Sequence, residues 1–284
     1  MDPRSESIGE KHINLEKLLS AKHVKAPRWL IRWAERLLHV PDLNRGIYLN
    51  REYFGIPFVH KMLEGHDEQD LNIEVRSIGI ENIPRDGHPI VAGNHPLGGP
   101  DGLALMSAVG RVRQDIRFPV NDFLLYLPGL KELFYPIDKV NKTKALASLE
   151  EAFAADNALL YFPAGICSRL QHGEIKDLEW KATFIKKAVR YQRDVVPVFT
   201  DARNRMRFYR LANLRKWLGI KFNFEMALLP AEMYAQRGKT FTVTFGRPIS
   251  WQTFDHRHTP YEWAQMVKEH VYKLKDNPYA IFEP

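Results

Sequence analysis

From residue 71 onward, the chain alternates between short apolar runs and longer segments whose apolar residues recur at helical spacing. The short runs, predicted as strands, are Ile73–Ile80, Pro89–Ala92, Ile116–Val120, Ala158–Phe162, Val195–Phe199, Phe222–Leu228 and Thr240–Phe245. The longer segments, predicted as helices, are Asp101–Val112, Lys142–Ala155, Trp180–Tyr191 and Pro260–Lys275. Alternating strands and helices form parallel sheets, because each return to the same edge needs a crossover that can hold a helix. We therefore expect an α/β fold with a mainly parallel mixed sheet flanked by helices.

The chain before this alternation has a different character. Pro27 can begin a helix. Apolar residues at helical spacing and arginines on another face follow it: Trp29, Leu30, Trp33, Leu37 and Leu38, with Arg28, Arg32 and Arg36. We predict that residues 1–68 form an N-terminal amphipathic helical segment and residues 69–284 the α/β domain. No apolar run approaches the ~20 residues needed to cross a bilayer, so any membrane contact would be peripheral.

The net charge limits the partners. Lys and Arg outnumber Asp and Glu by 41 to 34, a formal charge of +7. This excess suits an anionic partner, such as lipid head groups, an acidic carrier protein, a phosphorylated cofactor or nucleic acid. Zinc-finger spacing, an aromatic RNA-binding signature and a recognition helix are all missing from the sequence, so we expect no nucleic acid partner. The single cysteine, Cys167, excludes an internal disulfide and fits a reducing cytoplasm, and the polar first residues are unlike a secretory signal.

The strongest local motif lies in residues 90–102, where an apolar strand ends in His95 and a glycine turn leads into a helix. Catalytic groups in open α/β sheets gather at the carboxyl ends of strands. Asp101, in the first helical turn, could fold back across the Gly98–Gly99 turn and orient the imidazole. His95 would then act as a base on the substrate's own hydroxyl, since no Ser or Cys nucleophile adjoins the pair. A purely structural interpretation stays open, in which Asp101 caps its helix and His95 is a buried turn residue.

These residues resemble the glycerolipid acyltransferase superfamily of the lysophosphatidic acid acyltransferase type, whose first block is Asn-His, a short spacer, then Asp. Asn94, His95 and Asp101 match this block, with five intervening residues where four are commoner. The form of the motif is similar to the branch that contains bacterial aminolipid O-acyltransferases and proteins labelled haemolysins. The extra residue falls in the glycine turn, where a loop can absorb it.

The remaining blocks of the superfamily follow in order. Residues 129–139 resemble the second block, which ends in a basic residue that binds the acceptor's head group, here Lys139. Residues 162–169 resemble the third, with Ala164 where Glu is usual and Cys167 where Arg is usual, so that Arg169 would supply the displaced charge. Val196–Val198 matches the fourth block, and Gly246–Ile249 resembles a strand end near the family's C-terminus.

The resemblance implies an O-acyltransferase that passes a long-chain acyl group from an acyl thioester to a lyso-lipid hydroxyl. His95 and Asp101 would be the catalytic residues. The substrate-binding residues would be Asn94, Lys139, Phe162, Pro163, Gly165, Ser168 and Arg169. No metal or cofactor is expected beyond the co-substrate, either acyl carrier protein or a coenzyme A thioester. The acceptor is either lysophosphatidic acid or the 3-hydroxyacyl chain of an N-acylated amino acid, and Ala164 favours the second. The family's N-terminal helices often lie on the membrane, so we expect a peripheral protein on the cytoplasmic face of the inner membrane.

Other features admit two interpretations. Basic residues mixed with aromatic ones between Arg203 and Trp217 suit a surface facing anionic lipid or an acyl carrier, or else a solvated helix face. His256 and His258 could hold a metal, but no third ligand is evident and a loop is favoured. Cys167 is interpreted as a small spacer and Trp180 as a core residue. A non-catalytic lipid-binding protein on the same fold and a metal-dependent hydrolase remain as alternatives.

Overall fold

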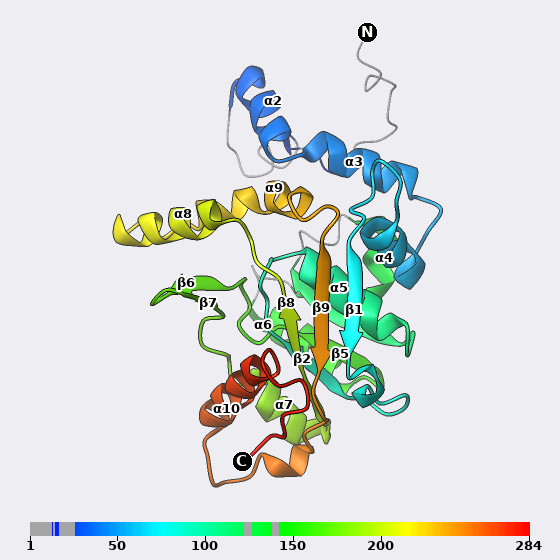
Figure 1. Ribbon diagram of the computed structural model, residues 1–284, viewed down its shortest axis with the longest axis vertical. Helices are drawn as coiled ribbons and strands as arrows, with labels where there is room; N and C mark the ends of the chain where they lie inside the picture. Colours follow the sequence, from blue (N-terminus) through cyan, green and yellow to red (C-terminus); the bar gives the residue numbers. More distant parts are fainter. Residues whose placement is uncertain (1–12, 14, 17–25, 122–126, 138–141) are drawn as a thin grey trace.

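The computed structural model describes residues 13, 15–16, 26–121, 127–137 and 142–284. In the continuous described segment before the sheet lie the helices α2 (Arg28–Leu37), α3 (Val40–Leu49) and α4 (Gly55–Glu64). Figure 1 shows α2 and α3 at one end of the long axis and the C-terminus at the other. The apolar face of α4 joins the main core, with Phe58, Val59 and Leu63 buried beside the sheet. No helix of the described residues combines the length and the apolar character that crossing a bilayer demands.

Within the described residues, seven strands form one sheet in the order β1-β9-β8-β2-β5-β3-β4. Their bounds are β1 Glu74–Ile78, β2 Ile90–Gly93, β3 Ile116–Asn121, β4 Phe134–Ile137, β5 Ala158–Tyr161, β8 Val195–Asp201 and β9 Thr240–Phe245. Every pair is parallel except β8 with β9. The predicted α/β class with a mainly parallel mixed sheet is confirmed.

Helices cover both faces of the sheet because successive strand residues point to opposite sides. In β2, Val91 belongs to the core under α4 and α5 (Pro100–Gly110), whereas Ile90 and Ala92 belong to the core on the other face. The second core is closed by α6 (Lys142–Ala154), α7 (Thr183–Tyr191) and α10 (Pro260–Lys273). Trp180 lies in this second core and is fully buried, as expected of a core residue.

The predicted strand at Phe222–Leu228 is wrong. Residues Phe224–Leu228 form a 3-10 turn that packs on α8 (Met206–Trp217) and leads into α9 (Leu229–Tyr234). Its second residue, Glu225, is buried in ion pairs with Arg169 and Arg215. The alternating apolar residues suggested a strand, but side chains from α8 and the β6–β7 hairpin occupy the place of a neighbouring strand. That hairpin, β6 (Arg169–Gln171) with β7 (Glu174–Lys176), and the short strand β4 were not predicted.

Candidate active site

The central strand β2 delivers His95 to the carboxyl edge of the sheet. All four residues of β2 are buried between the parallel strands β5 and β8, and His95 follows two residues after the strand ends. The chain then turns sharply at Gly98, which has a φ of +85°. A β-carbon at Gly98 would lie 2.8 Å from a methyl carbon of Leu229, so both the backbone conformation and the space require glycine. This turn brings the first turn of α5 back beside His95.

Asp101 holds the imidazole by a direct hydrogen bond. The Nδ1 atom of His95 lies 2.8 Å from Oδ2 of Asp101, whose side chain is fully buried, while 17% of the His95 side chain remains exposed. The same carboxylate accepts from the backbone amides of Leu97, Gly99 and Gly102 at 3.0 to 3.1 Å. Asp101 therefore both holds the glycine turn together and orients His95. An ionised carboxylate only accepts, so Nδ1 carries the hydrogen and Nε2 presents a lone pair.

The electrostatics of the pair follow from burial and mutual charge. Burial by itself would lower the pKa of His95, but the charge and the hydrogen bond of Asp101 outweigh it and raise that pKa above its ordinary value. Burial would likewise raise the pKa of Asp101, yet His95 and the turn amides hold it below its usual range. The carboxylate is thus ionised near neutral pH, and it stabilises the imidazolium that forms when His95 takes up a proton.

Phe162 fixes the plane of the imidazole. It follows β5, the strand next to β2, and its ring stacks on His95 with a centroid separation of 4.1 Å and an interplanar angle of 23°. Phe118 packs edge-on against the other side of Phe162 at 5.3 Å. Packed from one side and hydrogen-bonded at Nδ1, the imidazole keeps one orientation. Phe162, predicted to contact the substrate, lies beside His95 and Asp101.

Asp177, a second buried carboxylate behind His95, is not predicted from the sequence. It accepts from the backbone amide of His95 at 3.2 Å, from Oγ of Ser168 at 2.6 Å and from Nε1 of Trp180 at 2.9 Å. Burial raises the pKa of Asp177, and the hydrogen bonds from Ser168 and Trp180 act in the opposite direction. Asp177 therefore joins the segment after β5 to the end of β2 and holds the backbone that carries the base.

We expect Asp177→Asn to lower the free energy of unfolding by about 1–3 kcal/mol, since an amide leaves buried donors unpaired. Urea denaturation followed by circular dichroism measures this change. Asp156→Asn serves as the control, because the Asp156 side chain is 90% exposed. Equal unfolding midpoints for the Asp177 variant and the wild type would contradict the proposed role.

The side chains of Asn94 and Ser168 are hydrogen-bonded to other residues of the protein. The Asn94 side chain exchanges two hydrogen bonds with the backbone of Thr200, which ties β2 to β8. The amide of Ser168 donates to the carbonyl oxygen of His95 at 2.7 Å, and its hydroxyl donates to Asp177. Both residues position the base, and both also line the groove described below.

Arg169 was expected to contact the substrate, but its side chain points into the protein. Its guanidinium is buried and donates to the carbonyl oxygen of Cys167 at 2.7 Å and to Glu225 at 3.2 Å. The expected contact with an acceptor head group is therefore not supported by its position. Instead Lys181 lies beside the third block: a β-carbon on Gly165, where φ is +72°, would be 3.0 Å from the Lys181 ammonium. The Lys181 amide also donates to the carbonyl oxygen of Pro163. Lys139 lies outside the described residues.

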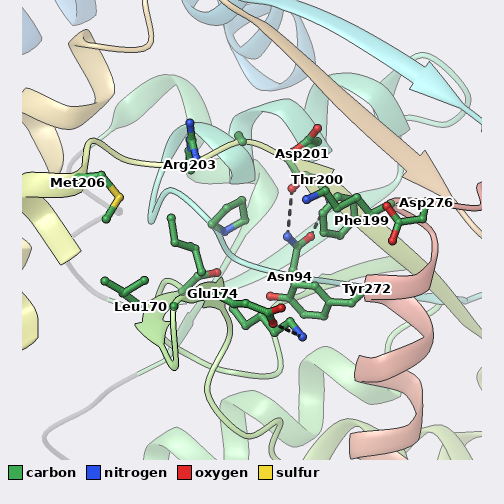
Figure 2. A pocket seen from close by; sticks show the side chains of 17 residues that line it. Asn94, Leu170, Glu174, Phe199, Thr200, Asp201, Arg203, Met206, Tyr272 and Asp276 are labelled. Carbon is green, nitrogen blue, oxygen red and sulfur yellow. Dashed lines mark hydrogen bonds and ion pairs between the residues drawn. The ribbon is translucent and has the colours of Figure 1, made fainter. Parts of the chain in front are cut away.

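Figure 2 shows a groove of about 430 Å³ next to the segment that carries His95. It includes Asn94 and Pro96, the neighbours of His95 in the chain, together with Ser168. The far wall is made by the β6–β7 hairpin, by residues 199–203 and Met206, and by Tyr272 near the end of α10. His95 itself does not line this groove: its side chain is 17% exposed, and the groove opens beside its neighbours in the chain.

Other candidate groups do not add to this site. Burial raises the pKa of Cys167 to about 11, which disfavours the thiolate form needed by a nucleophile. His258, in the loop before α10, packs edge-on against Trp263 of that helix. Among the described residues, no three His, Cys, Asp or Glu side chains are grouped so that they could hold a metal ion.

Comparison with known proteins adds three findings. The family model described as Acyltransferase matches residues 13–280. Proteins of Phocaeicola vulgatus and Bacteroides thetaiotaomicron, both named lyso-glycine lipid O-acyltransferase, are each 44% identical over 269 residues. These matches cover 92% of this chain and 95% and 97% of the two relatives. The crystal structure of a 1-acyl-sn-glycerophosphate acyltransferase from Thermotoga maritima aligns with 92% of this chain and 88% of its own, at 16% identity and a TM-score of 0.49.

Proposed function

This chain belongs to the acyltransferase family, and from that premise we propose that it transfers a long-chain acyl group from a thioester to the hydroxyl of a lyso-aminolipid. That it is an enzyme, and that a lyso-lipid is its acceptor, follow from relatives 44% identical over nearly the whole chain. The non-catalytic lipid-binding alternative is set aside accordingly. The hydrogen bond between His95, whose side chain is 17% exposed, and the buried Asp101 is the observation that carries the proposed chemistry.

In the proposed reaction, Nε2 of His95 removes the proton from the acceptor hydroxyl as its oxygen attacks the thioester carbonyl carbon. A new C–O ester bond forms and the C–S bond breaks. The departing thiolate then takes the proton from the imidazolium, so the base returns to its starting state. Asp101 stabilises the imidazolium between these two transfers. No acyl-enzyme is needed, in keeping with the buried thiol of Cys167.

Two observations favour an aminolipid acceptor over lysophosphatidic acid. The two relatives are named for a lyso-glycine lipid, whose name gives the class of acceptor. In addition, Arg169 is paired with Glu225, which leaves Lys181 as the cation beside Gly165 among the described residues. A carboxylate head group carries one charge and is matched by one ammonium, whereas phosphate is preferentially bound by the fork of an arginine. We propose that Lys181 contacts the carboxylate.

We further propose that the enzyme works at the cytoplasmic face of the inner membrane as a peripheral protein. On α2, Trp29 is 70% exposed and Trp33 58% exposed, and arginines at positions 28, 32 and 36 are exposed beside them. A helix that exposes both aromatic and basic side chains suits an interface with anionic lipid. The acyl donor would be either acyl carrier protein or a coenzyme A thioester.

Reconstitution with defined lipids tests this proposal. The purified protein is incubated with palmitoyl coenzyme A or palmitoyl acyl carrier protein and with N-(3-hydroxyacyl)glycine or lysophosphatidic acid. We expect mass spectrometry to detect the diacylated glycine lipid as the main product, and Lys181→Gln to raise KM for that acceptor. Phosphatidic acid as the main product would contradict the aminolipid assignment.

A further inference from the structure

Helix α8 begins in the core and ends in solvent. In its first half, Phe208, Tyr209 and Ala212 are buried against the 3-10 turn Phe224–Leu228 and the β6–β7 hairpin. From Leu214 onward the apolar side chains are exposed. Figure 1 shows α8 projecting sideways from the sheet. We call residues 214–222, the end of this helix and the turn after it, the α8 tip.

The α8 tip exposes five large apolar side chains. The exposed fractions are 48% for Leu214, 80% for Trp217, 54% for Leu218, 41% for Ile220 and 76% for Phe222. Single exposed apolar residues are common on protein surfaces, but a contiguous group on a projection indicates a contact with something apolar. None of these side chains contributes to the cores of the described residues.

The charge around the tip has one sign. Residues 206–223 contain five cations and no acidic residue: Arg207, Arg210, Arg215, Lys216 and Lys221. Arg207 and Arg215 are paired with the buried carboxylates of Glu232 and Glu225. The other three are exposed, and no ion pair joins them to an acid of the described residues. The tip therefore presents an apolar surface with positive charge beside it.

We propose that the α8 tip inserts Trp217 and Phe222 into an anionic lipid membrane, with Arg210, Lys216 and Lys221 at the level of the head groups. Aromatic side chains lie favourably at the boundary between head groups and acyl chains, and basic side chains gain from the negative surface potential. The proposal rests on the proposed function in one respect, namely that the acceptor lies in a membrane. It adds a second contact, beyond α2, and so defines how the enzyme is oriented.

An acyl carrier protein would be the other anionic partner, and the shape of the tip argues against it. A folded protein partner buries apolar side chains in a broad complementary face with about 800 Å² on each side. Here the most exposed aromatic residues stand at the end of a projection, a shape that suits insertion into a soft lipid surface. Binding to a membrane and binding to an acyl carrier protein would both weaken with salt. Substitution of the exposed aromatic residues therefore distinguishes the two partners.

The tip and the N-terminal helices are parts of one surface layer. The ring of His39, at the junction of α2 and α3, packs on the ring of Tyr234 in α9 with centroids 4.8 Å apart. Helix α9 follows the 3-10 turn on which α8 rests. In Figure 1, α2, α3, α9 and α8 occupy the same half of the molecule, away from the C-terminus. Two contacts held in one folded body bind a membrane more firmly than either alone, because the second contact forms without a further loss of translational freedom.

This orientation would also place the groove near the membrane. Met206, the first residue of α8, lines the groove, and the tip begins near the other end of the helix. A 12-residue helix spans about 18 Å at 1.5 Å per residue. The groove would thus lie within reach of the head groups when the tip is inserted.

Vesicle flotation at low protein concentration tests the proposal. The probes are vesicles of phosphatidylcholine alone and of phosphatidylcholine with 30% phosphatidylglycerol. On the anionic vesicles we expect the double variant Trp217→Ser/Phe222→Ser to reduce the partition coefficient about tenfold or more, from the loss of buried apolar area. Lys216→Gln/Lys221→Gln should reduce it to a similar degree on anionic vesicles only. The matched control is Tyr279→Ser/Ile281→Ser, which removes side chains 73% and 62% exposed near the C-terminus and should leave partition unchanged.

The readouts separate this proposal from the proposed function. Binding is measured without turnover, and turnover is measured separately on acceptor dispersed in detergent, where the tip variants should match the wild type. Loss of vesicle binding in the tip variants with no acyl transfer by any protein would support the tip and overturn the proposed reaction. Unchanged partition of both double variants would overturn the tip as a membrane contact. Unchanged partition with a raised KM for acyl carrier protein would assign the tip to the carrier instead.

Discussion

His95→Ala is expected to lower kcat/KM for acyl transfer by about a thousandfold or more, the upper part of the range for loss of a general base. The variant removes the group that takes the proton of the acceptor hydroxyl in the proposed reaction. In this variant the Asp101 carboxylate keeps its hydrogen bonds from the backbone amides of Leu97, Gly99 and Gly102. The fold and the binding to vesicles should therefore persist.

His256→Ala is the control for this variant, since His256 is an exposed histidine in the loop before α10. It should retain wild-type activity. The measurement is formation of the diacylated product, together with the unfolding midpoint of each protein. A His95 variant that folds normally and keeps more than a tenth of the activity would show that another group removes the proton.

Asp101→Asn is expected to lower kcat/KM by about a hundredfold to ten-thousandfold, as loss of the acid does in a catalytic triad. An amide can accept at one atom only, so it cannot serve His95 and all the turn amides as the carboxylate does. The imidazole then loses both its fixed tautomer and the charge that stabilises its protonated form. Asp86→Asn, on an exposed turn, is the control and should have wild-type kinetics.

The same variant makes a prediction about pH. His95 must be neutral to act as a base, and its pKa lies above the ordinary value of 6.5. In the wild type, kcat/KM should rise with pH as His95 loses its proton, with the midpoint of the rise above that value. Without the Asp101 charge, burial is the largest remaining influence and lowers the pKa of His95. The rise should then move to lower pH, and kcat/KM profiles between pH 5 and 9 measure the shift. A midpoint that stays in place would contradict the coupling.

Sequence periodicity was sufficient to predict most strands of the sheet. The predicted runs at Ile116–Val120 and Thr240–Phe245 are strands, because each combines β-branched and aromatic residues in a length that fits a buried strand. At Phe222–Leu228 the same pattern led to a wrong prediction. An alternating run becomes a strand only when a strand edge is available to pair with it, and that is decided elsewhere in the chain.

In the candidate site, too, contacts between residues close in the sequence could be predicted and contacts between distant residues could not. His95 and Asp101 are six residues apart, and a glycine turn that can be recognised in the sequence brings them together. Asp177 is 82 residues from His95, and Glu225 is 56 residues from Arg169. Neither pairing leaves a signal at the positions themselves, since an Asp before a helix and a Glu within an apolar run each have several ordinary explanations.

The sequence by itself predicted the α/β class, the place of His95 after a strand and its contact with Asp101. These depend on local periodicity and on a contact across one short turn. Only the tertiary structure decided which cations are exposed and which are held in buried ion pairs. Arg169 is buried against Glu225, whereas Lys181 lies beside Gly165. The reason is that a charged side chain is stable inside a protein only when a partner meets it there, and the partner comes from a distant part of the chain.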